Sequence, residues 1–125
     1  MKITSFNPLI LTKNSEATVK LFETLGFEQR HHKTSIEASN GANVSSVRMK
    51  DANGFYVDVT QVDNLPQDMM TIRMNVSDFD EAYEFLTARG FKNVNGDQVT
   101  ETGSSRATMM VSPSGFSISV AQHIK

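Results

Sequence analysis

Two stretches of the chain share one pattern of apolar residues: Asn7 to Phe27, NPLILTKNSEATVKLFETLGF, and Thr71 to Phe91, TIRMNVSDFDEAYEFLTARGF. They align without a gap at an offset of 71 − 7 = 64 residues, although only the final Gly-Phe is identical. In each stretch an alternating segment is followed by Asn or Asp, by a pair of Leu and Phe, and by Gly-Phe. A pattern that recurs over this length indicates two copies of one structural module.

The beginning of each stretch predicts a strand followed by a helix. Residues such as Ile72 and Met74 recur at every second position, which is the period of a strand with one apolar face. Asn14 and Asp78 are residue types that cap a helix N-terminus, and Asp78 with Glu81 has the spacing of a capping box. Each strand is therefore expected to lead directly into a capped helix.

The end of each stretch predicts where the helix packs and where it stops. We expect each helix to pack one apolar stripe on its own sheet, namely Leu21, Phe22 and Leu25 in the first helix and Ala82, Phe85 and Leu86 in the second. Gly26 and Gly90 follow these stripes, at the position where helices end with a residue in the left-handed conformation. Phe27 and Phe91 would then begin the next strand.

A second repeat covers the end of each module. Residues 51–61, DANGFYVDVTQ, align with residues 112–122, SPSGFSISVAQ, and share Gly, Phe, Val and Gln at corresponding positions. Both segments begin with turn residues and continue with an alternating pattern, which predicts a hairpin of a third and a fourth strand. The predicted organisation is one domain over residues 1–125, with module 1 at about 3–62, a linker at about 63–69 and module 2 at about 70–123.

The composition excludes several classes of function. The 125 residues carry a formal charge of −2, which gives no electrostatic footprint for nucleic acid or an anionic membrane. There is no Cys, so disulfides and thiolate nucleophiles are absent, and the sequence has neither a glycine-rich phosphate loop nor a GxSxG motif. The first residues contain no apolar run long enough for a membrane span or a signal peptide. We expect a soluble cytoplasmic protein.

The doubled module, the helix ending Leu25-Gly26-Phe27 and the closing segment SPSGFSISV from Ser112 to Val120 resemble the vicinal oxygen chelate superfamily. That superfamily includes glyoxalase I, extradiol dioxygenases, fosfomycin resistance enzymes and bleomycin-binding proteins. The resemblance covers nearly the whole chain and implies an α+β fold, with two βαβββ modules whose curved mixed sheets enclose a shared cavity. It also implies a homodimer, and it leaves open whether the modules lie side by side within one chain or are exchanged between chains.

The resemblance implies positions for a metal site. In the family, ligands come from the start of the first strand and the middle of the fourth strand of each module, which correspond here to Asn7, Asp58, Thr71 and Ser119. The family uses His, Gln and Glu there, because a divalent ion needs several good nitrogen or oxygen donors. Only Asp58 is such a donor; Asn7 offers a carbonyl oxygen, and the two hydroxyls are poor ligands. We therefore expect no metal and no other cofactor.

The three histidines do not restore a metal site. His31 and His32 are neighbours, so in a strand their side chains point to opposite faces. His123 lies four residues beyond Ser119, roughly 13 Å along a strand, which is too far to replace it.

Strand alternation extends the cavity face from the four carried-over positions. Leu9, Leu11, Arg73 and Asn75 would face the cavity from the first strands, and Tyr56, Thr60, Ser117 and Ala121 from the fourth strands. The opposite face of the fourth strands is wholly apolar, as a face covered by a helix must be: Phe55, Val57, Val59, Phe116, Ile118 and Val120. The predicted ligand-binding residues are Asn7, Leu9, Tyr56, Asp58, Thr71, Arg73, Asn75, Ser117 and Ser119.

Individual roles are less determined by the sequence. Arg73 is suited to hold a carboxylate or phosphate, but an ion pair with Asp58 or a solvated edge position would also account for it. Tyr56 either contacts a ligand or fills the core, and Asp58 is the candidate general base. A plain four-residue turn over 51–54 would turn Met49 into the cavity, whereas a one-residue bulge would place Arg48 there instead.

Three functions are compatible with this pattern. A cavity that is retained without its chelating residues predicts a metal-independent small-molecule binding protein of the glyoxalase/bleomycin-resistance type, which binds a polar or anionic organic ligand between the modules. The alternative is a glyoxalase-like lyase or isomerase with an altered metal site that uses Asp58 and Asn7. The third is a structural or regulatory module whose cavity no longer binds a ligand.

Overall fold

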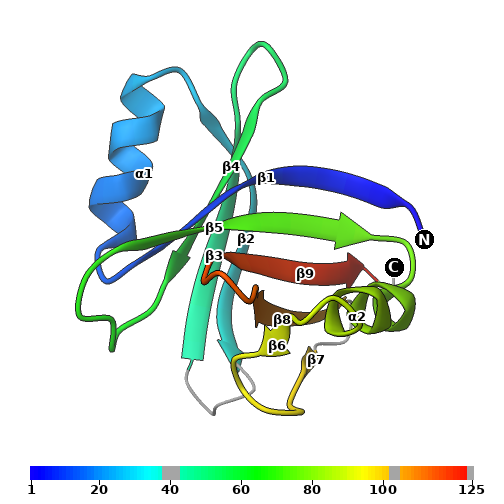
Figure 1. Ribbon diagram of the computed structural model, residues 1–125. Helices are drawn as coiled ribbons and strands as arrows, with labels where there is room; N and C mark the ends of the chain where they lie inside the picture. Colours follow the sequence, from blue (N-terminus) through cyan, green and yellow to red (C-terminus); the bar gives the residue numbers. More distant parts are fainter. Residues whose placement is uncertain (38–42, 102–104, 124–125) are drawn as a thin grey trace. The chain divides into compact units, whose positions relative to one another are not determined.

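A computed structural model describes residues 1–37, 43–101 and 105–123, of which 31–37, 43 and 44 are described by their backbone alone. The elements are β1 (Ile3–Thr12), α1 (Ser15–Thr24), β2 (Glu28–Glu37), β3 (Asn43–Lys50), β4 (Tyr56–Gln61), β5 (Met69–Val76), α2 (Phe79–Thr87), β6 (Lys92–Asn93), β7 (Thr100–Glu101), β8 (Ser105–Val111) and β9 (Ser117–His123) (Figure 1). This order confirms the α+β class and the two modules that each begin strand, helix, strand.

The described residues form two compact units. The N-unit comprises Asn7–Ile36 and Asn43–Met70, and its strands have the order β2-β3-β4-β1. The C-unit comprises Met1–Phe6, Glu37 and residues 71–101 and 105–123, and its strands have the order β5-β9-β8-β6, with β7 also paired to β8. The strand β1 therefore begins in the C-unit and continues into the N-unit. Both units contain parallel and antiparallel pairs, so their sheets are mixed.

The register of the N-unit sheet decides the position of Arg48. β1 is parallel to β4, with Leu9 opposite Asp58, and β3 is antiparallel to β4, with Arg48 opposite Asp58 and Met49 opposite Val57. Five residues, 51–55, connect β3 and β4. The Asp51 carboxylate stabilises this loop by accepting hydrogen bonds from the backbone N–H groups of residues 53 and 55. The loop is one residue longer than the plain turn, so Arg48 shares the face of Asp58, and Met49 lies in the core.

The C-unit repeats this register. β5 is parallel to β9 with Arg73 opposite Ser119, and β8 is antiparallel to β9 with Met109 opposite Ser119. Ser112 takes the place of Asp51, since its hydroxyl accepts hydrogen bonds from the N–H groups of residues 115 and 116. The internal repeat seen in the sequence therefore holds in the register of these strands, and Met109 occupies the position that corresponds to Arg48.

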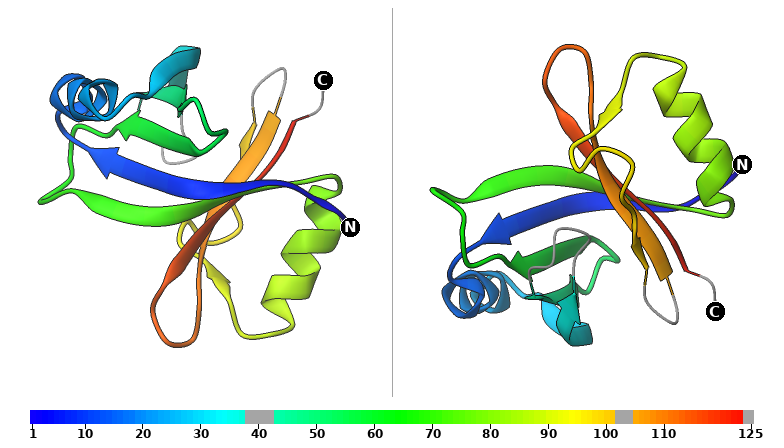
Figure 2. Two further views of the ribbon diagram at one scale, coloured as in Figure 1. Left: turned by 90° about the horizontal axis from the view of Figure 1, so that it is seen from above. Right: turned by 90° about the horizontal axis from the view of Figure 1, so that it is seen from below.

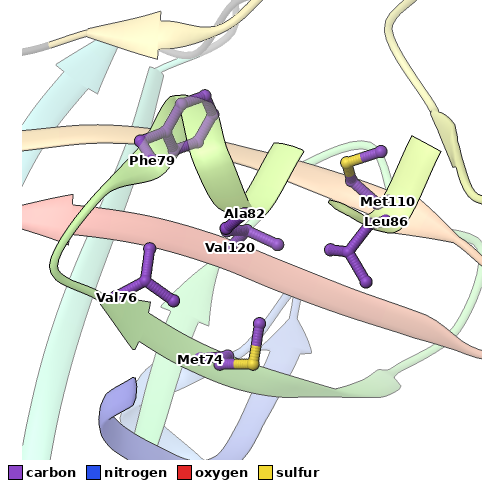
Figure 3. Packing of buried hydrophobic residues seen from close by; sticks show 7 residues of the cluster. All are labelled: Met74, Val76, Phe79, Ala82, Leu86, Met110 and Val120. Carbon is purple, nitrogen blue, oxygen red and sulfur yellow. The ribbon is translucent and has the colours of Figure 1, made fainter. Parts of the chain in front are cut away.

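Each unit has its own hydrophobic core between helix and sheet. The N-unit core contains Val19, Val47, Met49, Val57 and Val59, with Ile10, Phe22 and Phe27 packed against it. The C-unit core contains Met74, Val76, Phe79, Ala82, Leu86, Met110 and Val120 (Figure 3). It forms where α2 packs on β8 and β9 (Figure 2). In both units the alternating apolar face of the strands is the face that the helix covers, as the sequence pattern predicted.

The predicted helix stripes were only partly right. Val19 and Phe22 face the N-unit core, whereas Leu21 and Leu25 are exposed. In α2 the core face is Phe79, Ala82 and Leu86, and Phe85 is exposed. Apolar residues at i, i+1 and i+4 span two sides of a helix, so the spacing alone does not decide which side meets the sheet.

The predicted apolar face of the fourth strands was wrong at its first residue in both modules. Phe55 and Phe116 are 65% and 53% exposed, because each ends a hairpin loop rather than beginning a strand. Phe116 instead contacts Phe91 edge to face, with ring centroids 5.7 Å apart.

The helix termini follow the prediction closely. Asn14 and Asp78 cap α1 and α2, each by accepting a hydrogen bond from the N–H three residues later. Glu81 forms an ion pair with the amino group of Met1. The repeated glutamines Gln61 and Gln122 add a second cap, because their side-chain oxygens accept hydrogen bonds from the first N–H of each helix at 2.8 and 2.7 Å. This shared role accounts for a Gln at the end of both fourth strands.

The second module differs from the expected three strands after its helix. The second strand is divided into β6 and β7, which both pair with β8. Asn93 ends β6, because its side-chain oxygen accepts the N–H of Asn95 and Gly96 follows with φ 73°. In the part of the chain that the structure describes, neither helix is long and apolar enough to cross a membrane.

Candidate functional site

The polar face of the N-unit sheet is centred on Asn7, Arg48 and Asp58. Arg48 Nε donates to Asp58 Oδ1 at 3.0 Å, and Arg48 Nη2 donates to Asn7 Oδ1 at 2.8 Å and to Asp58 Oδ2 at 3.4 Å. Asn7 Nδ2 in turn donates to Asp58 Oδ2 at 3.1 Å and to the Pro8 carbonyl at 2.9 Å. The three side chains therefore form a closed network in which each contacts the other two.

This network is buried and has an aromatic neighbour. The side chain of Asp58 is 3% exposed and that of Arg48 is 23% exposed. The Arg48 guanidinium lies 4.7 Å from the centre of the Tyr56 ring, and Lys50 Nζ lies 5.4 Å from it. Tyr56 thus contacts two cations of its own unit, so its ring helps to hold Arg48 in place.

At the N-unit positions where the resemblance expects metal ligands, the described side chains do not fit a metal site. Both carboxylate oxygens of Asp58 and the amide oxygen of Asn7 already accept hydrogen bonds from the Arg48 guanidinium. A guanidinium keeps its charge at all accessible pH values, so it is a permanent cation between these oxygens. Among the described residues, no three His, Asp or Glu side chains are grouped closely enough to hold an ion.

The network also bears on the predicted catalytic role of Asp58. A general base needs a free oxygen that faces the reacting group. Here Asp58 forms an ion pair with Arg48, and both of its oxygens accept hydrogen bonds within its own unit. Asp58 has its counter-ion in Arg48 and does not need Arg73 for that purpose.

The polar face of the C-unit sheet is built differently. Thr71 Oγ1 donates to the Ser117 carbonyl at 2.8 Å and accepts from Ser117 Oγ at 2.7 Å, so these hydroxyls are paired across β5 and β9. Ser119 is buried opposite Arg73, which is partly buried. Asn75 is buried one row further along β5, and its Nδ2 donates to Ser5 Oγ at 2.6 Å.

The structure thus places the sequence-predicted residues in two groups. The N-unit brings together Asn7, Tyr56 and Asp58. Leu9 is buried beside Asp58, and its side chain has no polar group that could bind a ligand. The C-unit brings together Thr71 with Ser117, and Arg73 with Ser119 and Asn75. Arg48 was the residue that sequence reasoning left undecided. The feature of the sequence that could have placed Arg48 is the length of the loop between β3 and β4. That length depends on the hydrogen-bond acceptor at Asp51 and on Gly54, which has a positive φ of 88°.

The structure describes the side chain of one of the three histidines. His123 is exposed and is the last residue of β9. The side chains of His31 and His32 lie outside the described residues.

Solved structures show the same architecture. A methylmalonyl-CoA epimerase is similar over 100% of this chain and 99% of its own, with a TM-score of 0.71 and 19% identity. A Streptomyces coelicolor methylmalonyl-CoA epimerase, in complex with 2-nitronate-propionyl-CoA, is similar over 98% and 96%, with a TM-score of 0.65 and 17% identity. A glyoxalase/bleomycin resistance protein/dioxygenase superfamily member from Vibrio splendidus has a TM-score of 0.58 and 13% identity over 94% and 97%. This chain has the fold of the vicinal oxygen chelate superfamily.

The likeness lies in the fold and not in the sequence. No family model matches the chain, and no curated protein matches its sequence. Within the vicinal oxygen chelate fold, Asn7 and Thr71 lie in the first strands of the two modules, and Asp58 and Ser119 are the third residues of β4 and β9. These are the places at which the family resemblance expects metal ligands, and two of the four residues are bonded to Arg48.

Proposed function

We propose that this chain is a metal-independent binding protein for a small polar or anionic organic molecule. One observation carries the proposal: the guanidinium of Arg48 is hydrogen-bonded to Asn7 and Asp58, the two N-unit residues at expected metal-ligand positions. An internal cation takes the place where the resemblance would put a divalent ion.

Charge and geometry both favour this interpretation. A divalent ion that bound Asp58 would have to break the bonds of Arg48 and would bring a second cation close to the guanidinium. The repulsion between such charges is large in a buried site, because the surroundings screen it poorly. The other two positions, Thr71 and Ser119, supply neutral hydroxyls, and that of Thr71 is already paired with Ser117.

The chemistry of the polar face of each unit, taken separately, supports an anionic or polar ligand. Arg73 lies in the row of Ser119, and a guanidinium suits a carboxylate or phosphate with two parallel hydrogen bonds. Tyr56 offers an aromatic ring beside two cations. The complex of the Streptomyces coelicolor epimerase with an acyl-CoA analogue supports the same class, since that analogue is an organic anion.

The test is ligand binding without metal. The chain is stripped with EDTA and titrated with propionate, inorganic phosphate and propionyl-CoA, and binding is followed by calorimetry and by NMR of the ¹⁵N-labelled protein. We expect at least one of these anions to bind equally well with and without EDTA. Arg73→Met should weaken that binding by about tenfold or more, because it removes the guanidinium.

A matched control is Arg30→Met, which removes an arginine with a 57% exposed side chain. It should leave anion binding unchanged. If an anion binds only after Zn²⁺ or Ni²⁺ is added, the proposal is wrong and the glyoxalase-like lyase or isomerase becomes the better interpretation. If none of the three anions binds under any condition, the chain is not an anion-binding protein of this kind.

A further inference from the structure

Asn75 stands out on the C-unit sheet as a buried polar residue whose hydrogen bonding is incomplete. It is 3% exposed, and its Nδ2 donates to Ser5 Oγ, but its Oδ1 atom is buried and has no hydrogen-bond partner among the described residues. Buried carbonyl oxygens in proteins are almost always paired, because leaving one unpaired costs free energy. The unpaired Oδ1 atom of Asn75 lies on the candidate binding face of the C-unit sheet, where a ligand could supply the missing donor.

The direction of Asn75 follows from its strand. Its neighbours Met74 and Val76 belong to the core under α2, so Asn75 lies on the opposite face of β5, together with Thr71 and Arg73. The corresponding residue of the first module is Leu11, which has no polar group. The amide at this position is therefore particular to the second module.

The neighbours of Asn75 in its row do not complete its hydrogen bonds. The residue opposite it on β9 is Ala121, and the residue opposite Ala121 on β8 is Ala107. Both side chains are single methyl groups, which cannot donate a hydrogen bond to the amide oxygen. Arg73 lies two residues earlier on the same face, roughly 7 Å away along the strand, with the Ser119 hydroxyl beside it.

We propose that Asn75 Oδ1 accepts a hydrogen bond from the ligand, and that the ligand is a small hydroxy acid. Its carboxylate would lie toward Arg73 and Ser119, and its hydroxyl would donate to Asn75 over the methyl groups of Ala121 and Ala107. The inference rests on the proposed function and deepens it, because it names the class of anion. It assigns recognition of the ligand to the C-unit, whereas the polar groups of Asn7, Arg48 and Asp58 are occupied with one another.

The experiment compares acids that differ by one hydroxyl group. Lactate is paired with propionate and 3-hydroxybutyrate with butyrate, each titrated into the EDTA-treated full chain and followed by NMR. For at least one pair, we expect the hydroxy acid to bind about fivefold more tightly than its partner, the effect of one hydrogen bond to a buried acceptor. In Asn75→Leu the ratio should fall to about one.

A control variant and a folding check accompany this comparison. Asn53→Leu, at an exposed loop position, should leave the ratio unchanged. Thermal unfolding of Asn75→Leu shows whether the variant folds, and the comparison on the unmodified chain needs no variant. Equal affinities within both pairs would overturn this inference while the binding function stands. Failure of all four acids to bind would overturn it as well, and binding that requires added metal would overturn the proposed function itself.

Discussion

Arg48 is the residue on which the interpretation of the site depends. Its position is set by a single extra residue in the loop over 51–55, and that residue is accommodated because Asp51 caps the loop and Gly54 adopts a positive φ. The alternation of β3 alone allows either Arg48 or Met49 to face Asp58. Asn7 and Asp58 were expected on one face because the family resemblance places both there, and the hydrogen bond between their side chains agrees with that expectation.

Replacing Arg48 should destabilise the fold, because Asp58 then loses its counter-ion. Arg48→Met leaves Asp58 as a buried carboxylate without a counter-ion, so we expect a loss of about 2 to 3 kcal/mol in the free energy of unfolding. Urea denaturation measures this loss. Adding Asp58→Asn should recover part of it, because the unpaired charge is then removed.

The control for this substitution is Arg30→Met. Its guanidinium is exposed and lies 3.9 Å from Glu28, so the change should stay within about 0.5 kcal/mol. A stability of Arg48→Met equal to that of the unmodified chain would show that the network of Asn7, Arg48 and Asp58 does not form.

At the scale of elements, the most predictable features were the helix ends. Both helices close in the same way, with Gly26 and Gly90 at φ 104° and 92°, and with Phe27 and Phe91 donating back to the residue five positions earlier. The helix faces were harder to predict, as Leu21 and the other exposed apolar residues show, because contact with the sheet selects one of several apolar sides. The local sequence determines where a helix stops, whereas packing determines which side is buried.

The two glycines offer a matched pair of substitutions. A Cβ atom at Gly26 would meet nothing within 4 Å, so Gly26→Ala should cost only the left-handed conformation, about 1 kcal/mol. A Cβ atom at Gly90 would lie 2.8 Å from Cγ of Pro113, whose ring cannot rotate away. Gly90→Ala should therefore cost about 2 kcal/mol or more.

Thermal and urea unfolding of the two variants measure this difference directly. Pro113→Ala should remove the additional cost at Gly90 and leave the conformational part, because the close contact is then gone. Equal losses for Gly26→Ala and Gly90→Ala would contradict the contact between the end of α2 and the β8–β9 loop.

For the whole molecule, the repeat made the fold predictable, and the proposed function rests on the differences between its two copies. The offsets that align the two modules in sequence also align their strand registers, so Arg73 and Ser119 correspond to Leu9 and Asp58. One copy has acquired an internal ion pair on its polar face, and the other holds an unpaired amide oxygen at Asn75. A pattern of polar and apolar residues predicts that such side chains share a face. It does not predict which of them satisfy one another.

We propose that Arg48 occupies the place of a metal ion, and native mass spectrometry of the intact chain can show whether it does. The chain is produced in medium supplemented with zinc, nickel, manganese and magnesium, and is purified without a chelator or a metal-binding tag. We expect the mass of the polypeptide, alone or with a small organic molecule, and no divalent ion. One divalent ion per chain that survives buffer exchange would contradict the claim.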